Sequence, residues 1–310
     1  IIKKFPWILE INQNCIISPD ADGLICGLFM SEYFNWKIVG YYDNGKHLIL
    51  KKNTRAKDCI FLDTEIFRPN IRSIGHHIVR LRQKDFPGNW SNFKNCCNPN
   101  IIRGRTLKDG FSKKYPMGTI HFLIALTGTK INIKFADDAL FAVLQADGSI
   151  NRFLDKYSDN LADWLKYMGV IEDKGAFNEL LHHNIDLLEF CLKYVDYIQD
   201  YVKTKKDKIP ISDSNQTLVE SSFNMTKNGF SAECKKQIFE YLNFLANKTG
   251  WKFNKNNWQF DDFSIYCFSK NSVKPGVTTY QKAINDNALS MAFTSSLGFD
   301  YTIESPDKLP

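Results

Sequence analysis

The first half of the chain alternates short apolar runs with segments in which apolar residues recur at helical spacing. Runs with the length and composition of strands cover residues 15–18, 37–42, 47–50 and 59–63. The segment 73–81 also fits a strand, whereas the apolar segment 120–125 fits either a strand or a helix. Because strands and helices alternate, the pattern predicts an α/β fold with a mostly parallel sheet and flanking helices.

The second half opens with a different pattern. Apolar residues recur every three to four positions over 178–202, which predicts one long amphipathic helix. The polar and charged stretch that follows, 203–215, is typical of an exposed linker, and a capped amphipathic helix is expected over 231–250. We therefore expect three parts: a first domain over 1–177, a connecting helix and linker over 178–210, and a smaller α/β domain over 211–310.

Two carboxylates follow the first predicted strand directly. Asp20 and Asp22 stand at positions i and i+2, and the residues after Gly23 carry apolar side chains at helical spacing. Open α/β sheets bind ligands at the carboxyl ends of their strands. Two carboxylates this close repel each other unless a proton or a cation lies between them, which points to a divalent metal. Taken alone, such a pair is more often a helix cap or a solvated turn.

Three further places in the first domain can complete a metal site. Asp63 ends an apolar run and is expected at the same sheet edge as the first acidic turn. His76 and His77 are adjacent between apolar flanks, and Asp147 follows another apolar run. Carboxylate oxygens and imidazoles of this kind suit Mn²⁺ or Mg²⁺, and Asp63 is placed to bridge two ions. Singly, Asp63 and Asp147 would be ordinary loop carboxylates, and the two histidines would be one buried, hydrogen-bonded residue and one exposed residue.

The order of these motifs resembles that of the DHH phosphoesterase superfamily. The chain has Asp-x-Asp-Gly, a strand that ends in Asp, His-His, then Asn98-Pro99 before an apolar helix, and finally Asp-Gly, within about residues 10–165. The superfamily includes RecJ-type exonucleases, oligonucleotide and cyclic-dinucleotide phosphodiesterases, and family II pyrophosphatases. The resemblance implies a DHH-like fold and a set of roles: one ion held by Asp20 and Asp63, a second held by Asp22, Asp63, His76 and Asp147, and a substrate phosphate contacted by His77.

The chain departs from the family pattern at three points. The triplet Asp-His-His is Gly75-His76-His77, so the carboxylate that names the family is absent. Ile16 and Ser18 stand where the family has a further ligand of the first metal, which leaves that site poorer by one ligand. The C-terminal part lacks the Gly-Gly-Gly-His signature of the usual substrate-binding domain. We expect Gly75→Asp to raise a weakened activity by restoring the carboxylate.

Charge and composition limit the class of partner. The net charge of +6 and the pI near 8.7 are compatible with a phosphate-rich partner. Arg103 and Arg105 follow Asn98-Pro99, and we predict that they act on substrate phosphate together with His77. The eight cysteines include no C-x-x-C pair and are expected to be reduced, as in a cytoplasmic protein. No run approaches the roughly eighteen apolar residues of a membrane span, so no membrane partner is expected.

These features favour a hydrolase: a divalent-metal-dependent phosphodiesterase or nuclease that acts on single-stranded nucleic acid or short oligonucleotides with one or two Mn²⁺ or Mg²⁺ ions. The departures from the family pattern leave two alternatives open. One is a catalytically weakened member that binds nucleic acid, or a protein partner through its C-terminal domain, as a scaffold. The other is a hydrolase of small phosphates such as pyrophosphate or a cyclic dinucleotide.

Overall fold

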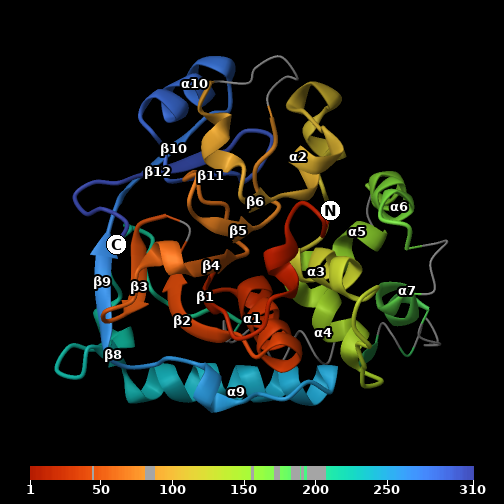
Figure 1. Ribbon diagram of the computed structural model, residues 1–310, viewed down its shortest axis with the longest axis horizontal. Helices are drawn as coiled ribbons and strands as arrows, with labels where there is room; N and C mark the ends of the chain where they lie inside the picture. Colours follow the sequence, from red (N-terminus) through yellow and green to blue (C-terminus); the bar gives the residue numbers. More distant parts are fainter. Residues whose placement is uncertain are drawn as a thin grey trace.

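The structure is a computed structural model that describes residues 1–43, 45–80, 88–154, 157–170, 175–182, 189, 192–193 and 207–310. A seven-stranded sheet in the order β6-β5-β4-β1-β2-β3-β9 forms its centre (Figure 1). From β6 to β2 the neighbouring strands run parallel, whereas β3 and β9 join in antiparallel pairs. The strands, in sheet order, are Cys96–Cys97, Arg72–Ile74, Cys59–Leu62, Asn14–Ile17, Lys37–Tyr42, His47–Lys51 and Phe263–Cys267. The fold is therefore α/β with a mostly parallel central sheet, as predicted.

The apolar runs locate four of these strands well, since β1 to β4 begin and end within one residue of the predicted bounds. Within the described part of the segment predicted over 73–81, the strand ends at Ile74, and residue 81 lies outside the described residues. Beyond Ile74, the backbone N–H groups of His77 and Ile78 donate to the Glu65 carboxylate, so they are not available to a neighbouring strand. The ambiguous apolar segment is helical and lies within α3 (Thr119–Thr127).

Both faces of the central sheet are buried. Along β1, Cys15 and Ile17 belong to one cluster of core residues, whereas Ile16 between them belongs to another. β4 alternates in the same way, with Ile60 in the first cluster and Phe61 in the second. A strand buried on both faces needs apolar side chains throughout, which explains the continuous apolar runs in the sequence.

Helices cover the first face. α1 (Ala21–Phe34) packs against β1, β2 and β4, and both α3 and α9 (Ala232–Thr249) pack against α1. α4 (Ala139–Gln145) packs against α9, which runs below α1 in Figure 1. The ends of α9 follow the predicted signals, because Ser231 accepts a hydrogen bond from the Cys234 N–H and Gly250 is left-handed, with φ 78°.

Four shorter helices lie between residues 99 and 181: α2 (Pro99–Arg103), α5 (Ile150–Leu154), α6 (Ser158–Tyr167) and α7 (Ala176–Leu181). The long helix predicted over 178–202 lies largely outside the described residues, and so does the start of the predicted linker. Among the residues that the structure describes, no helix is both long and apolar enough to cross a membrane. The seven described cysteines are free thiols, as expected, and a cytoplasmic location stays a prediction.

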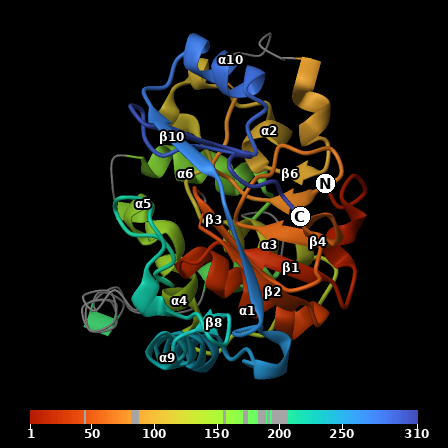
Figure 2. The ribbon, with the colours of Figure 1, turned by 90° about the vertical axis from the view of Figure 1, so that its left-hand side faces the viewer.

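The C-terminal part contributes to two sheets. β10 (Ser269–Val273), β12 (Phe299–Ile303) and β11 (Ser290–Phe293) form a smaller antiparallel sheet beside α10 (Val277–Asn285). Only Phe268 separates β10 from β9, so one extended segment links this sheet to the central one (Figure 2). A short hairpin joins β7 (Phe223–Asn224) to β8 (Gly229–Phe230). β9 and α9 belong to the C-terminal part but pack with elements of the first half of the chain. The division into three parts stays a prediction.

Candidate metal centre

Three neighbouring parallel strands deliver the candidate ligands to one edge of the sheet. Asp20 and Asp22 follow β1, Asp63 follows β4, and His76 and His77 follow β5. Because β1 pairs with β4 and β4 with β5, the carboxyl ends of these strands lie side by side. The sequence-based expectation that the first acidic turn and the strand-ending Asp meet at one sheet edge agrees with this topology.

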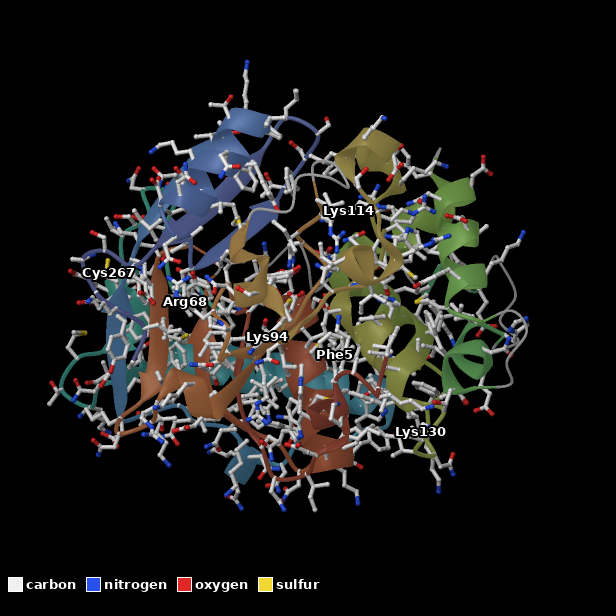
Figure 3. The ribbon with its side chains drawn as sticks, turned by 45° about the horizontal axis from the view of Figure 1, so that its top comes forward. Phe5, Arg68, Lys94, Lys114, Lys130 and Cys267 are labelled. Carbon is white, nitrogen blue, oxygen red and sulfur yellow. The ribbon has the colours of Figure 1, made fainter. Side chains whose placement is uncertain are left out.

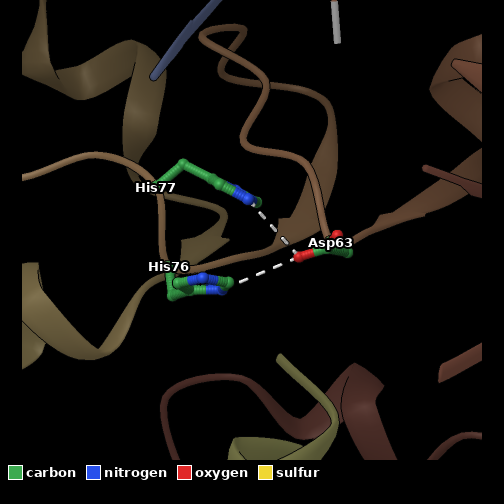
Figure 4. A group of neighbouring side chains, drawn as sticks. All are labelled: Asp63, His76 and His77. Atoms are coloured by element: carbon green, nitrogen blue, oxygen red, sulfur yellow. Dashed lines mark ion pairs between the residues drawn. The ribbon is translucent and has the colours of Figure 1, made fainter. Parts of the chain in front are cut away.

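Asp63 and the two histidines form the tightest group. Ligand atoms of the three side chains lie within 4.8 Å of one another. The Asp63 Oδ1 is 3.7 Å from His76 Nδ1 and 3.7 Å from His77 Nε2, and both rings point toward this carboxylate in Figure 4. Asp63 has a φ of 58°, a left-handed conformation that Asp tolerates better than most residues. The turn directs the carboxylate away from the sheet and toward the histidine loop.

Hydroxyl groups hold Asp63 and orient His76. The Thr119 hydroxyl donates to Asp63 Oδ1 at 2.7 Å and lies 3.0 Å from His76 Nδ1. Since its only proton goes to Asp63, the Thr119 oxygen accepts from Nδ1–H of His76. That hydrogen bond leaves Nε2 as the His76 nitrogen that faces outward, the arrangement that metal-binding histidines commonly need.

Asp147 lies on the outer side of His76. Its Oδ2 is 2.8 Å from His76 Nε2, and its side chain is 49% exposed. Burial would raise the pKa of Asp147, but the charge and hydrogen bond of His76 outweigh it and lower that pKa below its ordinary value. Like Asp63, Asp147 is left-handed, with φ 55°. It can therefore offer an ionised oxygen next to the imidazole.

Asp20 and Asp22 take different positions. Asp20 caps α1, since its side chain accepts from the Gly23 N–H, and its Oδ1 also lies 2.7 Å from the Ser18 hydroxyl. Asp22 is buried and accepts the backbone N–H groups of Thr119 and Ile120 at 2.5 and 3.0 Å. It thus caps α3 from a neighbouring helix. Both carboxylates serve as helix caps, as the simpler interpretation of the sequence has it, and both also adjoin the Asp63 group.

The Ser18 hydroxyl lies between two carboxylates whose negative charge has no nearby cation among the described residues to balance it fully. It lies 2.7 Å from Asp20 Oδ1 and 2.7 Å from Asp63 Oδ2, yet it has only one proton to donate. The second contact is favourable only if a carboxyl group is protonated or a cation lies close by. Burial, followed by neighbouring carboxylates, raises the pKa of Asp63 well above its usual range, and burial raises the pKa of Asp22. A divalent cation would relieve the same repulsion.

Glu65 belongs to the candidate site, and the sequence analysis misses it. Its buried Oε1 accepts from the His77 N–H at 2.6 Å, the Ile78 N–H at 3.0 Å and the Asn98 side-chain amide at 2.6 Å. Its Oε2 lies 3.1 Å from His77 Nδ1. A Cβ atom built on Gly75 would lie 2.7 Å from that same Oε2. Glu65 therefore fills the place beside the histidines where a side chain at position 75 would go.

This contact overturns the expectation for Gly75→Asp. An added side chain would collide with Glu65, and a carboxylate already lies beside the paired histidines. One sequence feature could have pointed to Glu65: Asp63 and Glu65 repeat the i, i+2 spacing of the two carboxylates in the first acidic turn. Gly75 itself gives no signal, since a glycine has no side chain to suggest a partner.

The buried Glu65 and the partly buried His77 form an ion pair. Burial alone would raise the pKa of Glu65, but the positive charge of His77 and the hydrogen bonds lower that pKa to about 2. For His77, burial alone would lower the pKa, because it disfavours the charged ring. The negative charge of Glu65 outweighs this effect, so the pKa of His77 is raised. The pair favours a cationic ring whose Nδ1 is engaged and whose Nε2 faces Asp63.

Arg103 and Arg105 are directed elsewhere. Both bind the Asp163 carboxylate, at 2.9 Å and 2.5 Å, and the Arg103 guanidinium also stacks on Trp164 and Tyr167. These contacts hold α2 against α6 and give no support to the predicted catalytic role of the two arginines. Their part in catalysis stays a prediction.

Other cations lie beside the histidines, around a cavity of about 500 Å³ that we call the Asp147 cavity. Asp147 and His76 line one side, and Lys114 and Arg152 also reach it. The Lys114 ammonium is 3.4 Å from the Phe293 carbonyl, so this lysine lies between the early helices and the C-terminal sheet (Figure 3). Burial lowers the pKa of Lys114 even though nearby carboxylates oppose the shift. The remaining lining includes the loop after β11, at 293–296.

No protein-family model, curated protein or solved structure matches the chain significantly. The resemblance to the DHH superfamily therefore stays an interpretation of the motifs, and the functional argument depends on the geometry of the site itself.

Proposed function

We propose that the protein is a divalent-metal-dependent phosphoesterase of the DHH type that hydrolyses single-stranded nucleic acid or short oligonucleotides. The observation that carries this proposal is the convergence of Asp63, His76 and His77 on one point, beside a cavity with cationic side chains. Buried carboxylates with raised pKa and an imidazole with an outward Nε2 fit Mn²⁺ or Mg²⁺. Catalytic phosphoesterase centres combine such ligands with groups that bind phosphate oxygens.

In this proposal Asp63 would be a ligand of each ion, whether one or two are bound. Asp20 would add an oxygen ligand to one ion, and Asp22, His76 and Asp147 would hold the other. Such ions supply Lewis acidity to a phosphoryl oxygen and make water a better nucleophile at neutral pH. The Ser18 hydroxyl supplies a neutral oxygen where a further charged ligand is lacking.

The chain's own residues bind and orient the phosphate. The Glu65 carboxylate fixes the His77 ring and favours its cationic form, so that Nε2–H can donate to a phosphate oxygen as negative charge develops. Lys114 and Arg152 extend this positive potential into the Asp147 cavity. Its volume of about 500 Å³ lies within the usual range for small-molecule sites and leaves room for more than an inorganic phosphate, which favours a nucleotide.

The test is Mn²⁺-dependent cleavage of a labelled single-stranded oligonucleotide by wild type, His76→Ala and His182→Ala. His182 is exposed, and within the described residues its imidazole bonds to the Asn178 carbonyl of α7, so it provides a matched histidine control. We expect cleavage by wild type and His182→Ala and none by His76→Ala. Binding without cleavage of oligonucleotide, pyrophosphate or cyclic dinucleotide would instead identify a scaffold, and cleavage that survives His76→Ala would reject this site.

A further inference from the structure

The Asp147 cavity has an aromatic part as well as a charged part. The proposed function uses only its charged side chains, for metal and for phosphate. Four of its described lining residues are aromatic: Phe111, Tyr115, Tyr157 and Phe293. Inorganic phosphate and pyrophosphate have no apolar surface to place against aromatic rings. The lining therefore fits a ligand that carries an apolar, planar group beside its phosphate.

Two of these rings are partly exposed, and the other two belong to the core. Tyr115 and Phe293 are each 2% exposed, and each packs on a neighbouring aromatic side chain. Phe111 and Tyr157 are only partly buried. Phe111 also packs against the core cluster that includes Phe293, so its ring is supported without being enclosed. Phe111 and Tyr157 are therefore the rings that a ligand in the cavity can reach.

A cation lies near each of these two rings. The Lys114 ammonium is 5.9 Å from the centre of the Phe111 ring, and Arg152 Cζ is 5.8 Å from the centre of the Tyr157 ring. Both distances are close to the limit of about 6 Å for a cation–π contact, so neither contact is a tight one. In a nucleotide only the sugar separates the base from its phosphate. A phosphate near these cations would therefore bring its base within reach of the rings.

Asn160 adds a polar group to the same lining. It is 4% exposed, and its side-chain amide donates to the Lys114 carbonyl at 2.8 Å. Its buried Oδ1 has no hydrogen-bond partner within the described part of the chain, which is unfavourable for a buried acceptor. The oxygens of an ionised phosphodiester cannot donate to this atom, whereas an N–H or O–H group of a nucleoside can. A nucleoside thus offers a partner both to the rings and to this acceptor.

We infer that the Asp147 cavity binds a nucleobase of the substrate, stacked on the rings of Phe111 and Tyr157, next to the phosphate that is hydrolysed. This inference rests on the proposed function and narrows its substrate class to phosphodiesters that carry a base. Every base has a π-face, so stacking of this kind brings little sequence preference. Pyrophosphate and a sugar-phosphate chain without bases should be poor substrates.

The test compares two substrates of equal charge in the full chain with Mn²⁺: a labelled single-stranded tetranucleotide, and the same chain with every base replaced by hydrogen. The variants are Phe111→Leu/Tyr157→Leu, which keeps apolar side chains but removes the rings, and its ring-preserving counterpart Phe111→Tyr/Tyr157→Phe. Phe239→Leu is the matched control. Phe239 is a partly buried residue of α9 outside the cavity lining, and the Lys255 ammonium is 4.4 Å from its ring centre.

We expect wild type to have a lower KM for the tetranucleotide than for the base-free chain. The double Leu variant should raise KM for the tetranucleotide on the order of tenfold, because it loses the stacking of a base. Its kcat should change little, since stacking holds substrate and transition state alike, and its KM for the base-free chain should equal that of wild type. The ring-preserving variant and Phe239→Leu should match wild type on both substrates.

A wild type that cleaves both substrates with equal KM would overturn this inference alone. So would a double Leu variant whose KM for the tetranucleotide is unchanged, or whose KM rises equally for both substrates. If the double Leu variant does not fold, the ratio of the two KM values in wild type decides the inference by itself. A wild type inert on both substrates would overturn the proposed function and this inference with it.

Discussion

Two glycines leave room for carboxylates at the centre. A Cβ atom at Gly118 would lie 2.8 Å from the Asp22 carboxylate, and one at Gly75 would lie 2.7 Å from that of Glu65. In each case the carboxylate can approach backbone N–H groups that a larger residue would shield. The Asp and His positions could be predicted because their types and spacing carry chemistry. Glu65 shares the i, i+2 spacing with Asp63, but that spacing does not reveal the contacts of Glu65 with residues ten or more positions later.

If Glu65 takes the place of a carboxylate at position 75, a carboxylate added at that position should raise activity only when that of Glu65 is removed. Glu65→Ala should lower Mn²⁺-dependent hydrolysis by about ten- to a hundredfold, since partners that orient such histidines commonly contribute that much. Gly75→Asp alone should lower both activity and thermal stability, because its side chain meets Glu65. The double variant Glu65→Ala/Gly75→Asp should be more active than Glu65→Ala, since the new carboxylate can enter the vacated space.

The measurements are kcat/KM on the labelled oligonucleotide and the midpoint of thermal unfolding for all three variants. The midpoint separates loss of folding from loss of orientation. Higher activity in Gly75→Asp alone, the result that the sequence by itself suggests, would show that Glu65 does not replace the absent carboxylate.

At the scale of elements, the parallel strands could be predicted and the helix that completes the centre could not. The runs that form β1 and β4 are apolar because both sheet faces are buried, and their ends locate Asp20 and Asp63. The apolar segment of α3 is compatible with strand or helix, since short buried runs lack a distinguishing period. Consequently Thr119, at the first turn of α3, gives no sequence signal of its contacts with Asp63 and His76.

Helices α2 and α6 provide a second prediction. Arg103→Gln should lower the free energy of unfolding by about 1 kcal/mol, because it removes an ion pair with Asp163 and stacking on two aromatic rings. It should leave KM for the oligonucleotide unchanged. Lys114→Gln should raise that KM, since Lys114 lines the Asp147 cavity. The reverse result, with KM raised only in Arg103→Gln, would restore the arginine to the substrate site.

At the scale of the whole molecule, long-range pairing shapes the site and local sequence patterns do not reveal it. β9 pairs with β3 although more than two hundred residues separate them along the chain. The Phe293 N–H donates to the His77 carbonyl across a similar sequence separation. These contacts bring the C-terminal sheet to the edge of the Asp147 cavity. Periodicity describes neighbours along the chain, so it located α9 but not the helices against which α9 packs.

The Asp63 carboxylate should lower the stability of the fold at neutral pH when metal is absent and raise that stability when metal is bound. In the metal-free protein its folded pKa is raised above the usual 3.8, so its contribution favours folding below that pH and is lost as pH rises through the folded pKa. Asn does not titrate and also tolerates the left-handed backbone. Without metal, Asp63→Asn should therefore gain stability relative to wild type as pH rises from about 4 to 7.

With Mn²⁺ the order should reverse, because a ligand that binds only the folded wild type stabilises it. Urea unfolding of both proteins across this pH range, with chelator or with Mn²⁺, measures the difference directly. If the difference in unfolding free energy between wild type and Asp63→Asn did not change with pH in chelator, and stayed the same with Mn²⁺, Asp63 would be neither a buried carboxylate with a raised pKa nor a metal ligand.

We propose that Asp63 is the common ligand of the metal centre. Elemental analysis would measure Mn²⁺ bound to wild type, Asp63→Ala and Asp20→Ala after loading and removal of free metal, with thermal unfolding to verify that each variant is folded. We expect bound Mn²⁺ in wild type, none in Asp63→Ala, and loss of only the weaker ion in Asp20→Ala. Equal Mn²⁺ occupancy in wild type and Asp63→Ala would contradict it.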